Sequence, residues 1–133
     1  LLDRFDIHVQ VTRVNYQDLN NTTGGMDSKT MNELVIECRE IQNKRLKKYN
    51  IETNAQMTPR LIKKYCKTDS QGEMLLKKAI DHRGLSARAY HKTLKLSRTI
   101  ADLDNSASIS IQHISEAIQY RTIINNNNDK NIF

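Results

Sequence analysis

The sequence predicts a mainly α-helical protein. Its 133 residues include only 4 Gly and 1 Pro, so few positions interrupt a helix. From residue 28 onward, apolar residues recur at the three- and four-residue spacing of amphipathic helices. Apolar residues make up 38% of the chain, which is adequate for one domain with a single core.

The first 14 residues follow a different pattern. Phe5, Ile7, Val9 and Val11 alternate with polar residues, and this period of two predicts a β-strand. Because a lone strand cannot bury its face, it needs a partner from another copy or from another part of the protein. Residues 15–27 contain an Asn, Thr and Gly cluster typical of a flexible connection.

Helices are predicted in the following order. The first runs from Ser28 to about Tyr49, and a short one follows the Thr58-Pro59 start signal. The next begins at a capping box, Ser70 and Glu73, and ends at Gly84. Ser86 caps a helix that runs to about Asp104 with an interior of Tyr90, Leu94, Leu96, Ile100, Ala101 and Leu103.

Ser110 caps the last predicted helix, which contains Ile111, Ile114, Ala117 and Ile118. Beyond it, residues 123–133 include four consecutive asparagines and are predicted to be a disordered tail. The 21 basic and 15 acidic residues give a net charge of +6, which suits contact with nucleic acid or with nucleotide phosphate. No apolar run is long enough to predict a membrane span, and we expect no membrane partner.

Residues with catalytic or metal-binding potential are scattered. Gly24-Gly25 is not followed by the Lys-Ser or Lys-Thr of a P-loop, and no hydrolase, zinc-protease or dinucleotide-binding motif is present. The four histidines belong to different predicted elements, so no metal site is predicted. Cys38 and Cys66 lie in helical patterns outside any CxxC motif, which predicts buried thiols in a reducing cytoplasm.

Two arginines stand out. Arg88 follows the Ser86 cap by two residues, at a helix end whose free N–H groups favour phosphate. It is either a surface arginine that reaches an acidic neighbour or a cation kept there to bind an anion. Arg4 either pairs with Asp3 or Asp6 or presents its guanidinium to a partner's phosphate.

Four segments resemble one family. LLDRFDIHVQV, which contains Arg4, resembles the segment that closes the ATPase core of magnesium-chelatase-like AAA+ proteins. NAQMTPRLIKKYC, LSARAYHKTLKLSRTIADLD and HISEAIQYR are similar to successive stretches of their C-terminal helical domain, in the competence-associated, ComM-like branch. The resemblance covers residues 1–122. His91-Lys92 departs from the acidic-basic pair common there, which we interpret as an outward-facing variation.

This resemblance implies a domain layout and two residue roles. Residues 1–14 would be the terminal strand of the ATPase core, and residues 28–122 a helical AAA+ lid of about five helices. Arg4 would be the arginine finger that enters the neighbouring subunit's ATP site, and Arg88 would be the sensor-2 arginine. The chain would then be part of a longer ATPase, without its P-loop or Walker B residues and without activity alone.

The same resemblance implies partners and cofactors. ATP and Mg²⁺ would bind in the full-length protein, the lid would contact the ATPase core of its own chain, and subunits would form a ring, expected to be a hexamer. A ComM-like helicase implies DNA as a substrate, and candidate contacts are Lys44, Arg45, Lys47, Lys48, Lys63 and Lys64. Charge runs on helices usually form solvated faces, and we find no interleaved aromatic residues for base stacking.

Two alternatives remain open at this point. The first is a stand-alone helical DNA-binding module, with residues 86–104 as a recognition helix; the apolar character of that segment argues against it. The second is the motor subunit of a tetrapyrrole magnesium chelatase.

Overall fold

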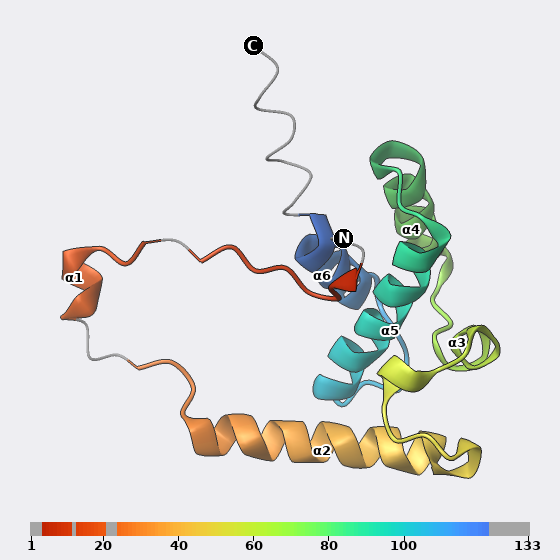
Figure 1. Ribbon diagram of the computed structural model, residues 1–133, viewed down its shortest axis with the longest axis horizontal. Helices are drawn as coiled ribbons and strands as arrows, with labels where there is room; N and C mark the ends of the chain where they lie inside the picture. The colour runs from red at the N-terminus through yellow and green to blue at the C-terminus, as the bar shows by residue number, and fades with distance from the viewer. Residues whose placement is uncertain (1–3, 12, 21–23, 123–133) are drawn as a thin grey trace.

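The computed structural model describes residues 4–11, 13–20 and 24–122. Five helices form the body of the protein (Figure 1): α2 (Ser28–Leu46), α3 (Pro59–Tyr65), α4 (Ser70–Arg83), α5 (Ala87–Leu103) and α6 (Ile111–Thr122). A one-turn helix α1 (Tyr16–Leu19) and two 3₁₀ segments, η2 (Lys47–Tyr49) and η3 (Asn54–Gln56), complete the elements. The prediction of a mainly helical protein with about five helices is confirmed.

The predicted N-terminal strand is not formed. Residues 4–11 and 13–14 adopt no strand conformation, because a strand needs a ladder partner and the described part of the chain supplies none. Phe5 and Val11 are 56% and 86% exposed. The backbone N–H of His8 donates instead to the Tyr120 carbonyl of α6, at 2.9 Å. The expected disordered tail, 123–133, lies outside the described residues.

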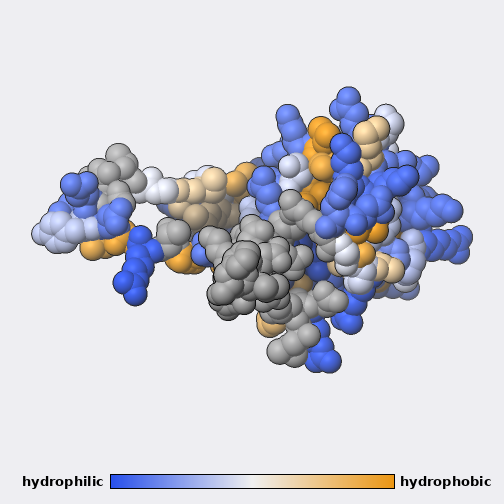
Figure 2. Space-filling model, turned by 90° about the horizontal axis from the view of Figure 1, so that it is seen from above, coloured by the Kyte–Doolittle hydropathy of each residue, from blue (hydrophilic) through white to orange (hydrophobic). Residues whose placement is uncertain are grey.

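Helix α2 is only half packed. Its N-terminal half projects beyond the other helices (Figure 1), and Met31 and Val35 there are each 50% exposed. Apolar side chains therefore lie on the surface of this projecting half (Figure 2). Burial begins at Cys38 and continues through Gln42 and Leu46, where α2 packs against α5.

The start of α4 corrects one prediction. Asp69, not Ser70, is the N-cap, and its carboxylate accepts a 2.7 Å hydrogen bond from the Gly72 N–H. A carboxylate at this position also interacts favourably with the helix dipole, which explains why the helix begins at Ser70, one residue earlier than a Ser70 cap would require. The end is as predicted, with Gly84 in the left-handed conformation at φ +60°.

Helix α5 lies at the centre of the fold and packs against α2, α3, α6 and η3. The Ser86 hydroxyl caps it by accepting from the Ala89 N–H, as predicted. Small side chains recur at every fourth position of one buried stripe: Ala89, Thr93, Ser97 and Ala101. Of the predicted interior, Leu94, Ile100 and Ala101 are buried, whereas Leu103 is 45% exposed. This central packing is unlike that of a recognition helix, which must present a face to DNA.

The hydrophobic core joins the C-terminal part of α2 with the four later helices. It contains Leu46, Met57, Leu61, Ile62, Cys66, Leu76, Ala79, Leu94, Ala101, Ile109, Ile114 and Ile118. Both cysteines are buried free thiols. None of the described helices combines the length and hydropathy that a bilayer crossing requires.

Candidate functional site

Arg88 lies in the first turn of α5 and is exposed. Its guanidinium has no hydrogen-bond or ion-pair partner within the described part of the chain. The first N–H groups of a helix have no acceptor inside the helix, and the Ser86 hydroxyl occupies only that of Ala89. A free guanidinium therefore stands beside unsatisfied N–H groups, an arrangement that can bind an anion.

Arg4 is also exposed, and its guanidinium has no partner among the residues that the structure describes. Its backbone carbonyl accepts a 3.0 Å hydrogen bond from Lys92 Nζ of α5. The same ammonium pairs with the Asp6 carboxylate at 2.8 Å. Asp6 therefore pairs with Lys92, and the salt bridge between Arg4 and Asp6 considered from the sequence is not formed.

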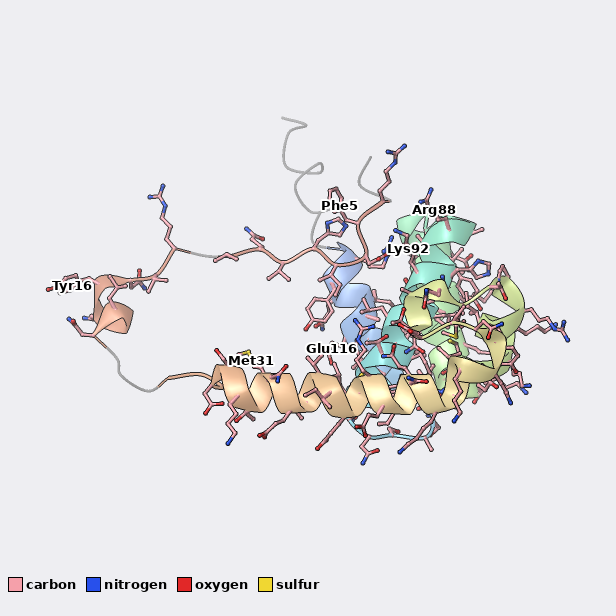
Figure 3. All side chains as sticks on the ribbon, turned by 60° about the horizontal axis from the view of Figure 1, so that its bottom comes forward. Phe5, Tyr16, Met31, Arg88, Lys92 and Glu116 are labelled. Carbon is pink, nitrogen blue, oxygen red and sulfur yellow. The ribbon has the colours of Figure 1, made fainter. Side chains whose placement is uncertain are left out.

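These contacts bring the two predicted site arginines to the same end of α5. Lys92 lies one helical turn after Arg88 and therefore on the same face, and it holds the backbone of Arg4. Figure 3 shows Phe5, Lys92 and Arg88 together at one end of the helical body. Lys92 is thus more than an outward-facing variation, because its side chain is only 17% exposed.

A second basic side chain holds the same segment. Arg121 Nη1 of α6 donates to the carbonyls of Phe5 and Asp6, each at 3.2 Å. Neither Lys92 nor Arg121 was predicted from the sequence as a site residue. The four-residue spacing from Arg88 to Lys92 is a signal that could have indicated Lys92, whereas nothing local links Arg121 to the N-terminal segment.

The structure also joins two Lys-Lys-Tyr segments, Lys47–Tyr49 and Lys63–Tyr65. The hydroxyls of Tyr49 and Tyr65 are 3.1 Å apart, and their rings meet edge to face. Lys64 Nζ donates to the Tyr49 hydroxyl at 3.1 Å, and the Lys48 and Lys64 ammonium groups lie 5.4 and 5.8 Å from its ring centre. The sequence-based statement that no aromatic residues interleave with these lysines is therefore wrong.

The environment of Tyr49 stabilises its ionised form. Hydrogen bonds from Tyr65 and Lys64, with the nearby Lys48 charge, lower the pKa of Tyr49 to about 8. The pKa of Lys64 is raised by the same hydrogen bond to Tyr49. The Lys48 and Lys64 ammonium groups beside Tyr49 make the surface locally positive, which would also attract phosphate.

Arg45 differs from the other candidate DNA contacts. Its guanidinium turns inward and binds both carboxylate oxygens of Asp102, with Nη1 at 2.9 Å from Oδ2. Its side chain is only 16% exposed. Arg45 is therefore not part of the outer basic face, because a buried carboxylate satisfies it.

Asp102 is the centre of a buried network that was not predicted from the sequence. Its side chain is fully buried, and it also accepts from Arg98 Nε at 3.1 Å and from Asn54 Nδ2 at 2.8 Å. Hydrogen bonding to Asp102 raises the pKa of Arg45, whereas burial lowers the pKa of Arg98. The available signal was an oppositely charged pair, Arg98 and Asp102, at four-residue spacing in one helix.

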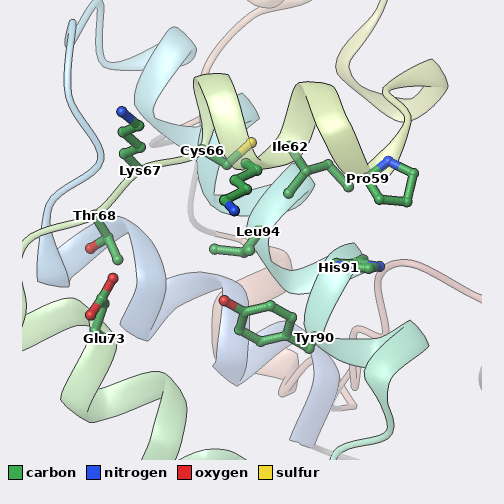
Figure 4. Close-up of a pocket in the computed structure, with 10 residues that line it drawn as sticks. Pro59, Ile62, Cys66, Lys67, Thr68, Glu73, Tyr90, His91 and Leu94 are labelled. Carbon is green, nitrogen blue, oxygen red and sulfur yellow. The ribbon is translucent and has the colours of Figure 1, made fainter.

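A cavity of about 610 Å³ lies between α3 and α5, with Glu73 of α4 also in its lining (Figure 4). Ile62, Cys66 and Leu94 form its apolar lining, and Tyr90 and Glu73 add polar groups. Burial raises the pKa of the Cys66 thiol to about 12, so this thiol stays protonated near neutral pH. No group of three or more potential metal ligands occurs among the described residues.

Comparison with known proteins gives consistent matches over most of the chain. Residues 25–121 match the family described as magnesium chelatase, subunit ChlI C-terminal. The chain is 40% identical over 124 residues to competence protein ComM of Haemophilus influenzae and 39% identical over 123 residues to protein YifB of Escherichia coli. Each match covers 92% of this chain and 24% of the relative.

A more distant relative is a Mycobacterium tuberculosis protein, 27% identical over 121 residues, or 91% of this chain and 24% of the relative. The chain thus spans about a quarter of the length of the curated relatives it matches. The match to the ChlI C-terminal family covers the five main helices apart from the last residue of α6. Together with the relatives, it shows that the chain belongs to the magnesium-chelatase-like AAA+ family, in its ComM-like branch.

Proposed function

We propose that this chain is the helical lid of a longer AAA+ ATPase, in which Arg88 is the sensor-2 arginine and Arg4 the arginine finger. The core of the longer protein would hold ATP and Mg²⁺, and its subunits would form a ring, expected to be a hexamer. The match to a quarter of the length of ComM and YifB supports a longer protein. It also favours a ComM-like DNA helicase over a tetrapyrrole chelatase motor.

The unpaired Arg88 guanidinium at the start of α5 is the observation that carries this proposal. A cation in the first turn of a helix is disfavoured by the helix dipole, and Arg88 has no acidic partner among the described residues to offset that cost. A γ-phosphate would offset it by accepting from the guanidinium. Nucleotide loss would then release α5 and move the lid against the core.

Replacing Arg88 by Ala in the full-length ATPase is expected to lower ATP turnover tenfold to hundredfold. The reason is the loss of one hydrogen bond to a charged group, which contributes about 1.5–3 kcal/mol. Steady-state phosphate release measures the effect. Arg60→Ala is the matched control, because Arg60 is an exposed arginine in the first turn of α3. Equal turnover of the two variants would contradict the sensor role.

DNA contact is a second proposed function, supported by the two joined Lys-Lys-Tyr segments. Lys48 and Lys64 come from different elements and converge on one tyrosine, so their charges act at one place on the surface. Duplex DNA presents closely spaced phosphates, which such a pair of ammonium groups can contact. The remaining exposed candidates, Lys44, Lys47 and Lys63, belong to the same two segments or to the preceding turn.

The double substitution Lys48→Gln and Lys64→Gln is expected to reduce the salt dependence of DNA affinity by about two in log–log slope, since each phosphate contact contributes about 0.9. Fluorescence anisotropy with a labelled duplex at several salt concentrations measures it. Lys77→Gln with Lys78→Gln removes the same charge from the exposed face of α4. If both pairs reduce the slope equally, the effect is one of net charge and the proposed contact is absent.

A further inference from the structure

One lysine connects the segment of Arg4 to the helix of Arg88. Lys92 Nζ donates to the Arg4 carbonyl at 3.0 Å and pairs with the Asp6 carboxylate at 2.8 Å. Both contacts lie in the three residues that begin at Arg4. The Arg4 guanidinium has no partner among the described residues. It extends from a backbone whose carbonyl group accepts a hydrogen bond from Lys92.

The exposure of the two partners indicates which of them is fixed by the fold. The Lys92 side chain is 17% exposed, whereas that of Asp6 is 65% exposed. Lys92 belongs to α5, the central helix of the body, and Asp6 belongs to a segment without secondary structure. The helix therefore positions the segment, and a displacement of α5 would carry the segment with it.

Helix α6 adds a second attachment of the same segment. Arg121 donates to the Phe5 and Asp6 carbonyls, and the His8 N–H donates to the Tyr120 carbonyl. Among the described residues, the Asp6 carboxylate pairs with Lys92. The guanidinium groups of Arg4 and Arg88 have no such partner. The segment is thus bound through backbone groups and the Asp6 carboxylate, which leaves the Arg4 side chain available to a phosphate.

We propose that Lys92 is a positioning residue that couples Arg4 to the lid. This inference rests on the proposed roles of Arg4 and Arg88. When α5 moves with the nucleotide bound near Arg88, Lys92 transmits the movement to Arg4, which serves the site of the neighbouring subunit. Occupancy of one ATP site then sets the position of the arginine offered to the next, which makes hydrolysis cooperative around the ring.

The test replaces Lys92 by Met in the full-length ATPase, which retains the length of the side chain and removes its charge and its hydrogen bonds. We expect kcat to fall about tenfold to hundredfold, because a small misplacement of a catalytic group has this effect. Cooperativity in ATP is expected to be lost, and Lys92→Arg is expected to restore both properties. Hydrogen exchange of the His8 amide is expected to accelerate in Lys92→Met.

Lys95→Met is the matched control. Lys95 lies on the same helix and also donates to a carbonyl of another segment, that of Ala55 at 2.7 Å, but no hydrogen bond or ion pair joins it to the described residues 4–8. If Lys92→Met has the same kcat, cooperativity and His8 exchange as Lys95→Met, the coupling is refuted. Thermal unfolding of each variant checks that the fold is retained. If Lys92→Met does not fold, Lys92→Gln takes its place.

A double-substitution cycle separates this inference from the proposed function. In an Arg4→Ala background, Lys92→Met is expected to lower kcat no further, because a positioning residue acts through the group it positions. Additive effects would overturn the coupling while leaving both arginine roles intact. If Arg4→Ala and Arg88→Ala themselves leave turnover unchanged, the proposed function fails, and the inference that rests on it fails with it.

Discussion

Replacing Asp102 by Ala is expected to lower the free energy of unfolding by about 3–5 kcal/mol, the usual cost of removing one partner of a buried ion pair. The carboxylate is fully buried, and the side chains of Arg45 and Arg98 around it are 16% and 4% exposed. Without Asp102, two guanidinium groups would face each other with no carboxylate between them. Asn54, which also donates to Asp102, would lose an acceptor.

Urea unfolding of the chain, followed by far-ultraviolet circular dichroism, measures this loss. Asp81→Ala is the matched control, because Asp81 is an exposed aspartate of α4, where a substitution is expected to change stability by less than about 0.5 kcal/mol. A similar midpoint for Asp102→Ala and Asp81→Ala would mean that water satisfies the two arginines and that the network does not stabilise the fold.

Replacing Arg4 by Ala in the full-length ATPase is expected to lower kcat by a factor of about 10³ or more, since arginine fingers in other NTPases contribute about 10³–10⁵. The guanidinium would neutralise charge that develops on the transferred phosphoryl group. Because α5 and α6 hold the segment through its backbone carbonyls, removal of the side chain should leave the segment in place. Nucleotide affinity should therefore change much less than kcat.

Mixed rings test whether Arg4 acts on a neighbouring subunit. Arg4→Ala subunits retain an intact ATP site, whereas subunits with a disabled nucleotide site retain Arg4. Mixing two inactive variants of these kinds is expected to restore part of the activity, because some intact sites then receive a neighbour's arginine. Arg13→Ala, a change of an exposed arginine in the same N-terminal region, is the control for loss of charge. Mixed rings without activity would contradict action between subunits.

Local sequence signals predicted the helices well because each signal acts within a few residues. The Ser86 cap, the Gly84 stop and the Thr58-Pro59 start all lie where the pattern places them. The error at Ser70 has the same local origin, since Asp69 beside it is also a good cap. The strand predicted at residues 1–14 is not formed in the described residues for a different reason, because pairing requires a partner that periodicity cannot supply.

The candidate site also has features that local patterns predict and features that depend on contacts between distant residues. The positions of Arg4 and Arg88 were predicted from motifs and from the helix start, but their nearness depends on Lys92, which lies 88 residues from Arg4. Arg45 illustrates the converse case. Its run of neighbouring cations predicted an exposed face, and only the approach of α5 brings the Asp102 carboxylate to it, 57 residues away.

The helical class, most helix ends and the family follow from local sequence patterns, because these depend on periodicity, capping and motif order within short windows. Which charges are buried and which remain free depends on how the helices pack. Arg45 and Arg98 converge on Asp102, Lys92 and Arg121 hold the N-terminal segment, and two Lys-Lys-Tyr segments meet. The Arg98–Asp102 pair lies on a buried face of one helix, and the other contacts join different elements. All of them depend on helix packing, which local patterns do not encode.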